Sequence, residues 1–65
     1  MSNEDFRHAL TSLGLSVVGS AKYLGLSRRQ VQRIGAPNNP APVPPLVEKV
    51  ISLLLAGKLS LEDLL

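Results

Sequence analysis

Residues 16–34, SVVGSAKYLGLSRRQVQRI, decide the fold that we expect for this chain. The first half predicts a helix over residues 17–24, with Ser16 as its N-terminal cap. Gly25 follows, and a glycine adopts the positive φ of a sharp turn at no steric cost. We therefore place the turn at Gly25 and Leu26 and begin a second helix after Ser27, whose side chain caps it.

The second of these helices combines an apolar face with a long polar face. Val31 and Ile34 are spaced to point inward, and a glutamine three residues after Ser27 completes a capping box. The outward positions carry long side chains that can contact DNA bases: Arg28, Arg29, Gln30, Gln32 and Arg33. Arginine forms paired hydrogen bonds with guanine, and glutamine does so with adenine. Two short helices, a tight turn and a basic second helix are typical of a helix-turn-helix that reads the major groove.

Charge is distributed unevenly along the chain. The net charge is only +2, but no acidic residue occurs between Asp5 and Glu48, and three of the five basic residues in that interval lie in the second helix. Three arginines alone are also typical of a solvated helix face. Because the apolar framework of the two helices is present as well, we favour nucleic acid as the partner. We expect contacts with the DNA backbone from Ser16, Ser27, Lys22, Tyr23, Asn38 and Asn39.

The segments on either side of this stretch have simpler patterns. The N-terminal segment predicts a helix capped by Ser2 or Asn3 and ended by Gly14. Its apolar stripe is formed by Phe6, Ala9, Leu10 and Leu13. All five prolines lie within residues 37–45, so we expect residues 36–45 to form a stiff, extended connector. A ligand for an SH3-like domain is disfavoured because no basic residue flanks these prolines.

Residues 46–65 are more apolar than one small domain requires. A helix that begins at Pro45 or Leu46 and stops at Gly57 has only three polar residues between positions 46 and 56, and a short helix capped by Ser60 follows. A helix that is apolar over most of its circumference must be covered on more than one side. A central core helix would satisfy this pattern, but we favour a dimer surface, formed by Val47, Val50, Ile51, Leu54, Leu55, Leu61 and Leu65.

Length and composition exclude several classes of protein. Sixty-five residues are enough for one domain, 1–65, and without cysteine there is no disulfide framework or cysteine-based zinc site. No apolar run is long enough to span a membrane, and the N-terminus lacks the positive segment of a signal peptide, so we expect a cytoplasmic protein. We expect no enzyme, cofactor, metal or small-molecule ligand, because there is no nucleophile–base pair, metal cluster or phosphate loop.

The chain resembles helix-turn-helix domains of the Cro/repressor type. The resemblance rests on an alanine, a glycine four residues later and apolar residues at fixed offsets: Ala21, Leu24-Gly25-Leu26-Ser27, Val31 and Ile34. The longer layout is similar to small repressors of phages and mobile elements, including anti-CRISPR-associated regulators. That layout is carried by Gly25-Leu26-Ser27, Arg29, Pro40-Ala41-Pro42 and the apolar helix over residues 46–56.

This resemblance implies an all-α, lambda-repressor-like domain of four or five helices, with the helix-turn-helix at residues 16–35 and dimerisation helices at 46–65. It also implies a homodimeric repressor that binds an inverted repeat in double-stranded DNA and often controls its own operon. The chain departs from the pattern at Val17 and Val18, where a polar residue usually touches phosphate, and at Ser20, where an apolar residue is typical.

Two other functions compete with DNA binding. A protein-interaction module, such as an adaptor or an antitoxin-like partner, would use the C-terminal leucine surface on another protein. RNA binding is less favoured because Phe6 and Tyr23, the only aromatic residues, do not form a stacking platform. We therefore expect a sequence-specific, DNA-binding transcriptional regulator.

Overall fold

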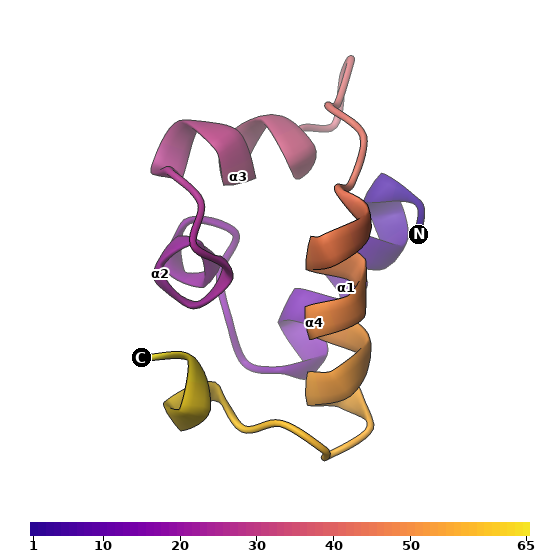
Figure 1. Cartoon of the computed structure of the whole chain (residues 1–65). Helices are drawn as coiled ribbons and strands as arrows, with labels where there is room; N and C mark the ends of the chain where they lie inside the picture. The colour runs from indigo at the N-terminus through magenta and orange to yellow at the C-terminus, as the bar shows by residue number, and fades with distance from the viewer.

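The fold is all-helical, as predicted, in a computed structural model that describes residues 1–65 (Figure 1). The α-helices are α1 (Asn3–Ser12), α2 (Ala21–Leu24), α3 (Arg28–Ile34) and α4 (Pro45–Leu55). Two short 3-10 helices, η1 (Val18–Ser20) and η2 (Leu61–Leu64), precede α2 and end the chain. None of these helices has both the length and the apolar character that a membrane-spanning segment requires.

Helix α1 begins and ends as its sequence predicts. The hydroxyl of Ser2 accepts a hydrogen bond from the Asp5 amide at 3.0 Å, which caps the first turn. Gly14 follows the last turn with a φ of 75°, a conformation that glycine adopts without steric strain. The apolar stripe of the helix turns inward, so that Phe6 and Leu10 are almost completely buried.

The helix predicted over residues 17–24 is a 3-10 turn followed by one turn of α-helix. Ser16 does start it, because its hydroxyl accepts a hydrogen bond from the Gly19 amide at 2.9 Å. Ser20 is completely buried, and its hydroxyl donates to the Val17 carbonyl at 2.6 Å. Side chains that bond to nearby backbone in this way compete with regular α-helix, and glycine weakens it further. The tighter η1 therefore replaces the first half of the expected helix.

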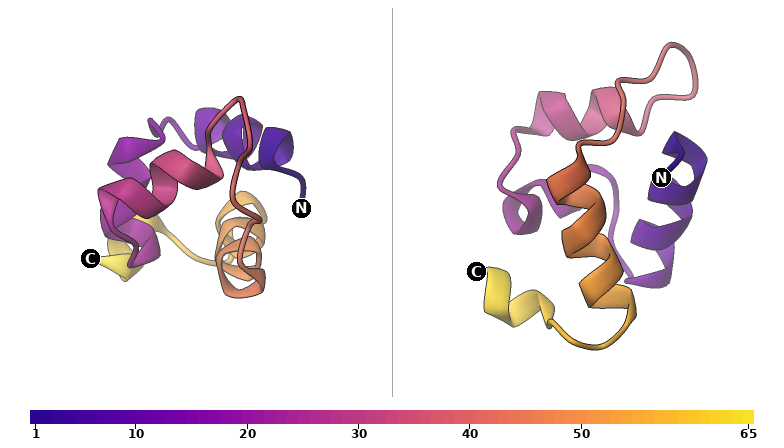
Figure 2. Two further views of the ribbon diagram at one scale, coloured as in Figure 1. Left: turned by 90° about the horizontal axis from the view of Figure 1, so that it is seen from above. Right: turned by 45° about the vertical axis from the view of Figure 1, so that its right-hand side comes forward.

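The hydrophobic core lies where α1, α3 and α4 meet. It consists of Phe6, Ala9, Leu10, Ile34, Val47 and Ile51, and partly buried residues such as Leu24 and Leu26 pack against it. Helices α1 and α4 run side by side, and α3 lies across one end of this pair (Figure 2). The short helix η2 returns towards α2 near the other end. One face of α3 is thus held by the core while the opposite face is open.

The structure corrects the predicted dimer surface on α4. Val47, Ile51 and Leu54 are only 5%, 0% and 7% exposed, because they face the core of the same chain, so they are not available to a second copy. With about 3.6 residues per turn, Leu46, Val50 and Leu53 form the neighbouring stripe. Leu46 is 72% exposed and Leu53 is 43% exposed, while Val50 between them is half-buried, so this second stripe is the more open one.

The other predicted interface residues lie outside this stripe. Leu55 is 49% exposed, but helical spacing places it on the opposite side of the core face from Leu46. The short last helix that was predicted after Ser60 is η2, a 3-10 helix that ends at Leu64. It leaves Leu65 78% exposed and Leu61 partly buried. Its predicted cap is present, since the Ser60 amide donates to the Asp63 carboxylate at 3.0 Å.

Candidate nucleic-acid interface

The start of α3 is closed by the capping box that its sequence predicts. The Ser27 hydroxyl accepts a hydrogen bond from the Gln30 amide at 3.1 Å, and the Ser27 amide donates to Gln30 Oε1 at 2.8 Å. These two bonds satisfy donors that a helix N-terminus otherwise leaves free. They also give Gln30, one of the predicted base-contacting residues, a structural role at the start of the helix.

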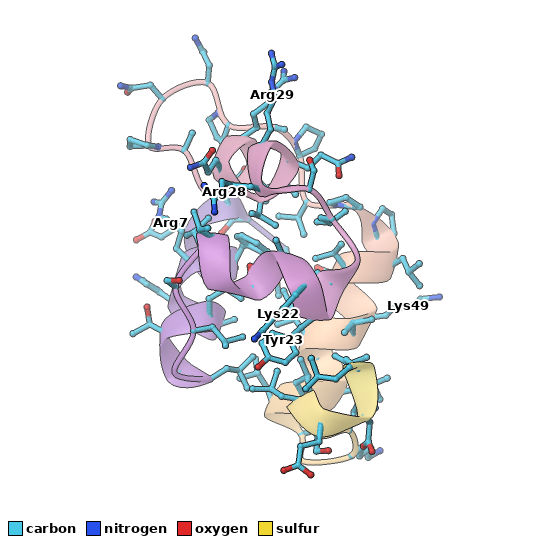
Figure 3. The ribbon with its side chains drawn as sticks, turned by 90° about the vertical axis from the view of Figure 1, so that its left-hand side faces the viewer. Arg7, Lys22, Tyr23, Arg28, Arg29 and Lys49 are labelled. Atoms are coloured by element: carbon cyan, nitrogen blue, oxygen red, sulfur yellow. The ribbon has the colours of Figure 1, made fainter.

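The buried residues of α3 determine which side chains point outward. Val31 and Ile34 are 0% and 3% exposed and therefore mark the inner face. With about 3.6 residues per turn, Arg29 lies on the side of the helix opposite these two, with Gln32 and Arg33 on either side of it. Arg28 and Gln30 lie at the edges. All five predicted base-contacting side chains are exposed. Figure 3 shows Arg29 extending away from the body of the molecule.

The arginines of α3 have no acidic partner in the fold. The only contacts between a basic and an acidic group in the fold join the Met1 ammonium to Glu48, and the His8 imidazole to Glu4. Arg29 and Arg33 are four residues apart, and like charges at this spacing destabilise an isolated helix by about 0.2–0.5 kcal/mol. Nothing within the chain offsets this repulsion. The arrangement costs a little stability and leaves three positive charges free on one surface, as an anion-binding site requires.

The predicted backbone contacts are divided between two regions of the molecule. The hydroxyls of Ser16 and Ser27 are both engaged as helix caps, each accepting a backbone amide. Lys22 Nζ lies 5.0 Å from the centre of the Tyr23 ring, a cation–π distance. Figure 3 shows this pair on the side of α2 that faces η2, below Arg28 and Arg29. Lys22 and Tyr23 therefore lie apart from the outer face of α3.

The loop after α3 carries the other predicted backbone contacts. Asn38 and Asn39 are exposed, and Asn39 has a φ of 47°, a left-handed conformation that asparagine tolerates better than most residues. The loop projects beyond the C-terminal end of α3 (Figure 1). The tip of the loop and the outer face of α3 thus belong to the same end of the molecule.

Two polar side chains of α1 hold the far end of α3, and the sequence alone did not single them out. Asn3 Nδ2 donates hydrogen bonds to the carbonyl oxygens of Ile34 at 2.8 Å and Ala41 at 2.6 Å. Arg7 Nη1 donates to Gly35 O at 3.5 Å and to Ala36 O at 3.3 Å. Their only signal in the sequence is the four-residue spacing, which places both on one face of α1.

Comparisons with protein-family models, with curated proteins and with solved structures find no match to this chain. The structure brings no group of three or more histidine, cysteine, aspartate or glutamate side chains together where a metal ion would fit. Its function is therefore inferred from the geometry of its own residues.

Proposed function

We propose that this protein is a helix-turn-helix transcriptional regulator that binds double-stranded DNA and inserts α3 into the major groove. The main support for the proposal is the outer face of α3. Arg29 and Arg33 are neighbours there, and neither has an acidic partner. An α-helix is about 10–12 Å across with its side chains, which matches the roughly 12 Å width of the major groove. Arg29 is the residue best placed to contact guanine, and Gln32 the one best placed to contact adenine.

The tight connection between α2 and α3 supports the same assignment. Gly25 has a φ of 68°, and Leu26 packs against the core from the turn. The turn and the capping box hold α3 at a fixed angle to α2, so the long side chains of α3 are presented together rather than on a mobile segment. A recognition element must be rigid in this way for several bases to be read at once.

We further propose that the protein acts as a homodimeric repressor of an inverted-repeat operator, its own operon being a candidate target. The stripe on α4, in which Leu46 and Leu53 are exposed and Val50 is half-buried, supports a second copy as partner, because exposed apolar surface marks interaction sites. A two-fold dimer contacts two half-sites about 34 Å apart, one turn of the double helix.

A selection from random DNA duplexes tests this function. We expect a palindromic consensus, and we expect Arg29→Ala to lose about 1–3 kcal/mol of binding free energy on it, with relaxed base preference. Lys58→Ala is the matched control, because it removes one positive charge outside α3 and should leave the base preference unchanged. Recovery of no preferred sequence by the wild-type protein would overturn base-specific recognition.

A protein-interaction module remains the second candidate, favoured by the large exposed fractions of Leu46 and Leu65. The salt dependence of binding distinguishes the two. Neutralising several phosphates makes affinity fall steeply as salt rises. An interface of leucines responds little, so a partner that stays bound at high salt would favour this alternative.

A further inference from the structure

The loop between α3 and α4 is tied at its base. It leaves α3 at Ile34 and returns at Ala41, and both carbonyl oxygens accept a hydrogen bond from the same side-chain nitrogen of Asn3. The Ala41 amide also donates to the Arg33 carbonyl at 2.9 Å. The two ends of the loop are therefore joined to each other and to the first turn of α1.

Arg7 binds the first residues of the same loop. Its guanidinium donates to the carbonyl oxygens of Gly35 and Ala36, just beyond the last turn of α3. The last carbonyls of a helix have no partners within the helix, and a positive charge near them interacts favourably with the helix dipole. Asn3 thus provides, from another helix, a donor for the last carbonyl of α3, and Arg7 binds the two carbonyls that follow it.

Two prolines restrict the backbone at the tip of this loop. Pro37 and Pro40 stand on either side of the two asparagines and restrict φ at both positions. The tip projects past the end of α3 (Figure 1), and the side-chain amides of Asn38 and Asn39 are exposed there. Side-chain amides are common donors to phosphate oxygens, which fix the register of a protein on DNA without reading its sequence.

We propose that Asn3 and Arg7 are positioning residues for DNA binding. They hold the loop at a set angle to α3, so that the amides of Asn38 and Asn39 reach the phosphates beside the groove that α3 enters. Neither Asn3 nor Arg7 touches DNA in this arrangement. The inference rests on the proposed function, and it adds a second contact region that depends on α1.

A double-mutant cycle tests the dependence. The double variant Asn38→Ala/Asn39→Gly removes both amides, and the glycine keeps the positive φ at position 39. We expect this variant, and separately Asn3→Ala, to bind the selected duplex about three- to tenfold more weakly, as expected for the loss of one or two hydrogen bonds. When Asn3→Ala is added to the loop variant, almost no further loss of affinity should follow, because the side-chain amides that Asn3 positions are already absent.

A second double-mutant cycle, with Arg7 in place of Asn3, tests the same dependence independently. Arg7→Ala should weaken binding in the wild-type loop but not in the loop variant, whereas Arg7→Lys keeps a charged donor and should bind nearly as wild type. All affinities are measured at a temperature where circular dichroism shows each variant to be folded. Equal losses from Asn3→Ala or Arg7→Ala in both loop backgrounds would indicate a general structural role and overturn the inference.

The outcome separates this inference from the proposed function. If the wild-type protein selects a duplex and Arg29→Ala relaxes its base preference, but the cycles show no coupling, DNA recognition stands and the positioning role is wrong. If the wild-type protein selects no duplex and binds none tightly, both are wrong.

Discussion

At the scale of single residues, two apparent departures from the Cro/repressor pattern have packing roles. Val17 lies against Gly35 so closely that a Cβ on this glycine would stand 3.0 Å from Val17 Cγ1. Ser20 fills a completely buried position and satisfies its hydroxyl on the Val17 carbonyl. The first contact brings the residue before η1 against the end of α3, where a polar side chain at position 17 would lose the apolar contact, and the second closes the turn of η1 itself.

The close approach of Val17 and Gly35 leads to a prediction about stability. Gly35 has a φ of −87°, which any residue adopts, so Gly35→Ala introduces no backbone strain. The cost of overpacking outweighs the stabilisation that follows from the lower entropy of the unfolded chain, and we expect a net loss of about 1 kcal/mol in the free energy of unfolding. Urea denaturation measures it. The loss should largely disappear in a Val17→Ala background, and an equal loss in both backgrounds would contradict this explanation.

Residues whose partners are local could be predicted from sequence, and those with distant partners could not. Ser27 and Ser60 were predicted as caps, and Ser2 as one of two candidates, because each bonds a residue three positions away. Asn3 bonds residues 31 and 38 positions away, and no spacing rule connects them. The exposed arginines of α3 were predicted for the same local reason, whereas their lack of acidic partners depends on the folded chain.

At the scale of the secondary-structure elements, the rigidity of α3 depends on its N-terminal cap. Ser27→Ala removes a hydroxyl that accepts the Gln30 amide, a change that costs about 0.5–2 kcal/mol in other helices. We expect a lower midpoint of unfolding by urea and weaker binding to the selected duplex. Ser27→Thr retains the hydroxyl and is the matched control. Equal stability of the alanine and threonine variants would show that the cap is dispensable.

The cap of η2 is sensitive to acid. The hydrogen bond from the Ser60 backbone amide, with a smaller contribution from its side chain, holds the pKa of Asp63 below its ordinary value of 3.8. Because the folded pKa is the lower one, the carboxylate stabilises η2 above pH 3.8, and this contribution is lost as pH falls through the folded pKa. An NMR titration of the Ser60 amide should report the change. Asp63→Asn should remove it, and an unchanged titration in that variant would exclude Asp63 as its source.

The hydrophobic periodicity of the sequence predicted where the helices lie better than it predicted their type or their buried face. Helices α1, α3 and α4 were expected within a residue or two because each has an apolar stripe and an end signal. The helix over residues 17–24 was expected to be regular, but a glycine and a buried serine tighten its first half into η1. The two apolar stripes of α4 could not be told apart by composition, because only the position of α1 decides which one is covered.

At the scale of the whole molecule, the open stripe of α4 predicts how two copies would associate. A lysine at position 46 or 53 places a charge in the middle of the proposed interface, whereas the fold does not need either leucine buried. We expect Leu46→Lys and Leu53→Lys to be folded monomers in sedimentation equilibrium and to bind a single half-site.

Leu55→Lys is the matched control for this dimer. Leu55 is 49% exposed, close to the 43% of Leu53, but it lies on the other side of the core face. The variant should remain dimeric. A wild-type monomer at the concentrations used for DNA binding, or monomers from all three variants alike, would contradict the proposed interface.

Helix α3 is closed at both ends before any partner arrives, by the capping box at Ser27 and by the donors of Asn3 and Arg7. Binding would then begin from a surface that is already folded, with little conformational entropy left to lose. Segments that fold as they bind show a large negative heat-capacity change and a strongly unfavourable entropy. Calorimetry of this protein with its duplex should instead show a heat-capacity change no larger than the contact area accounts for.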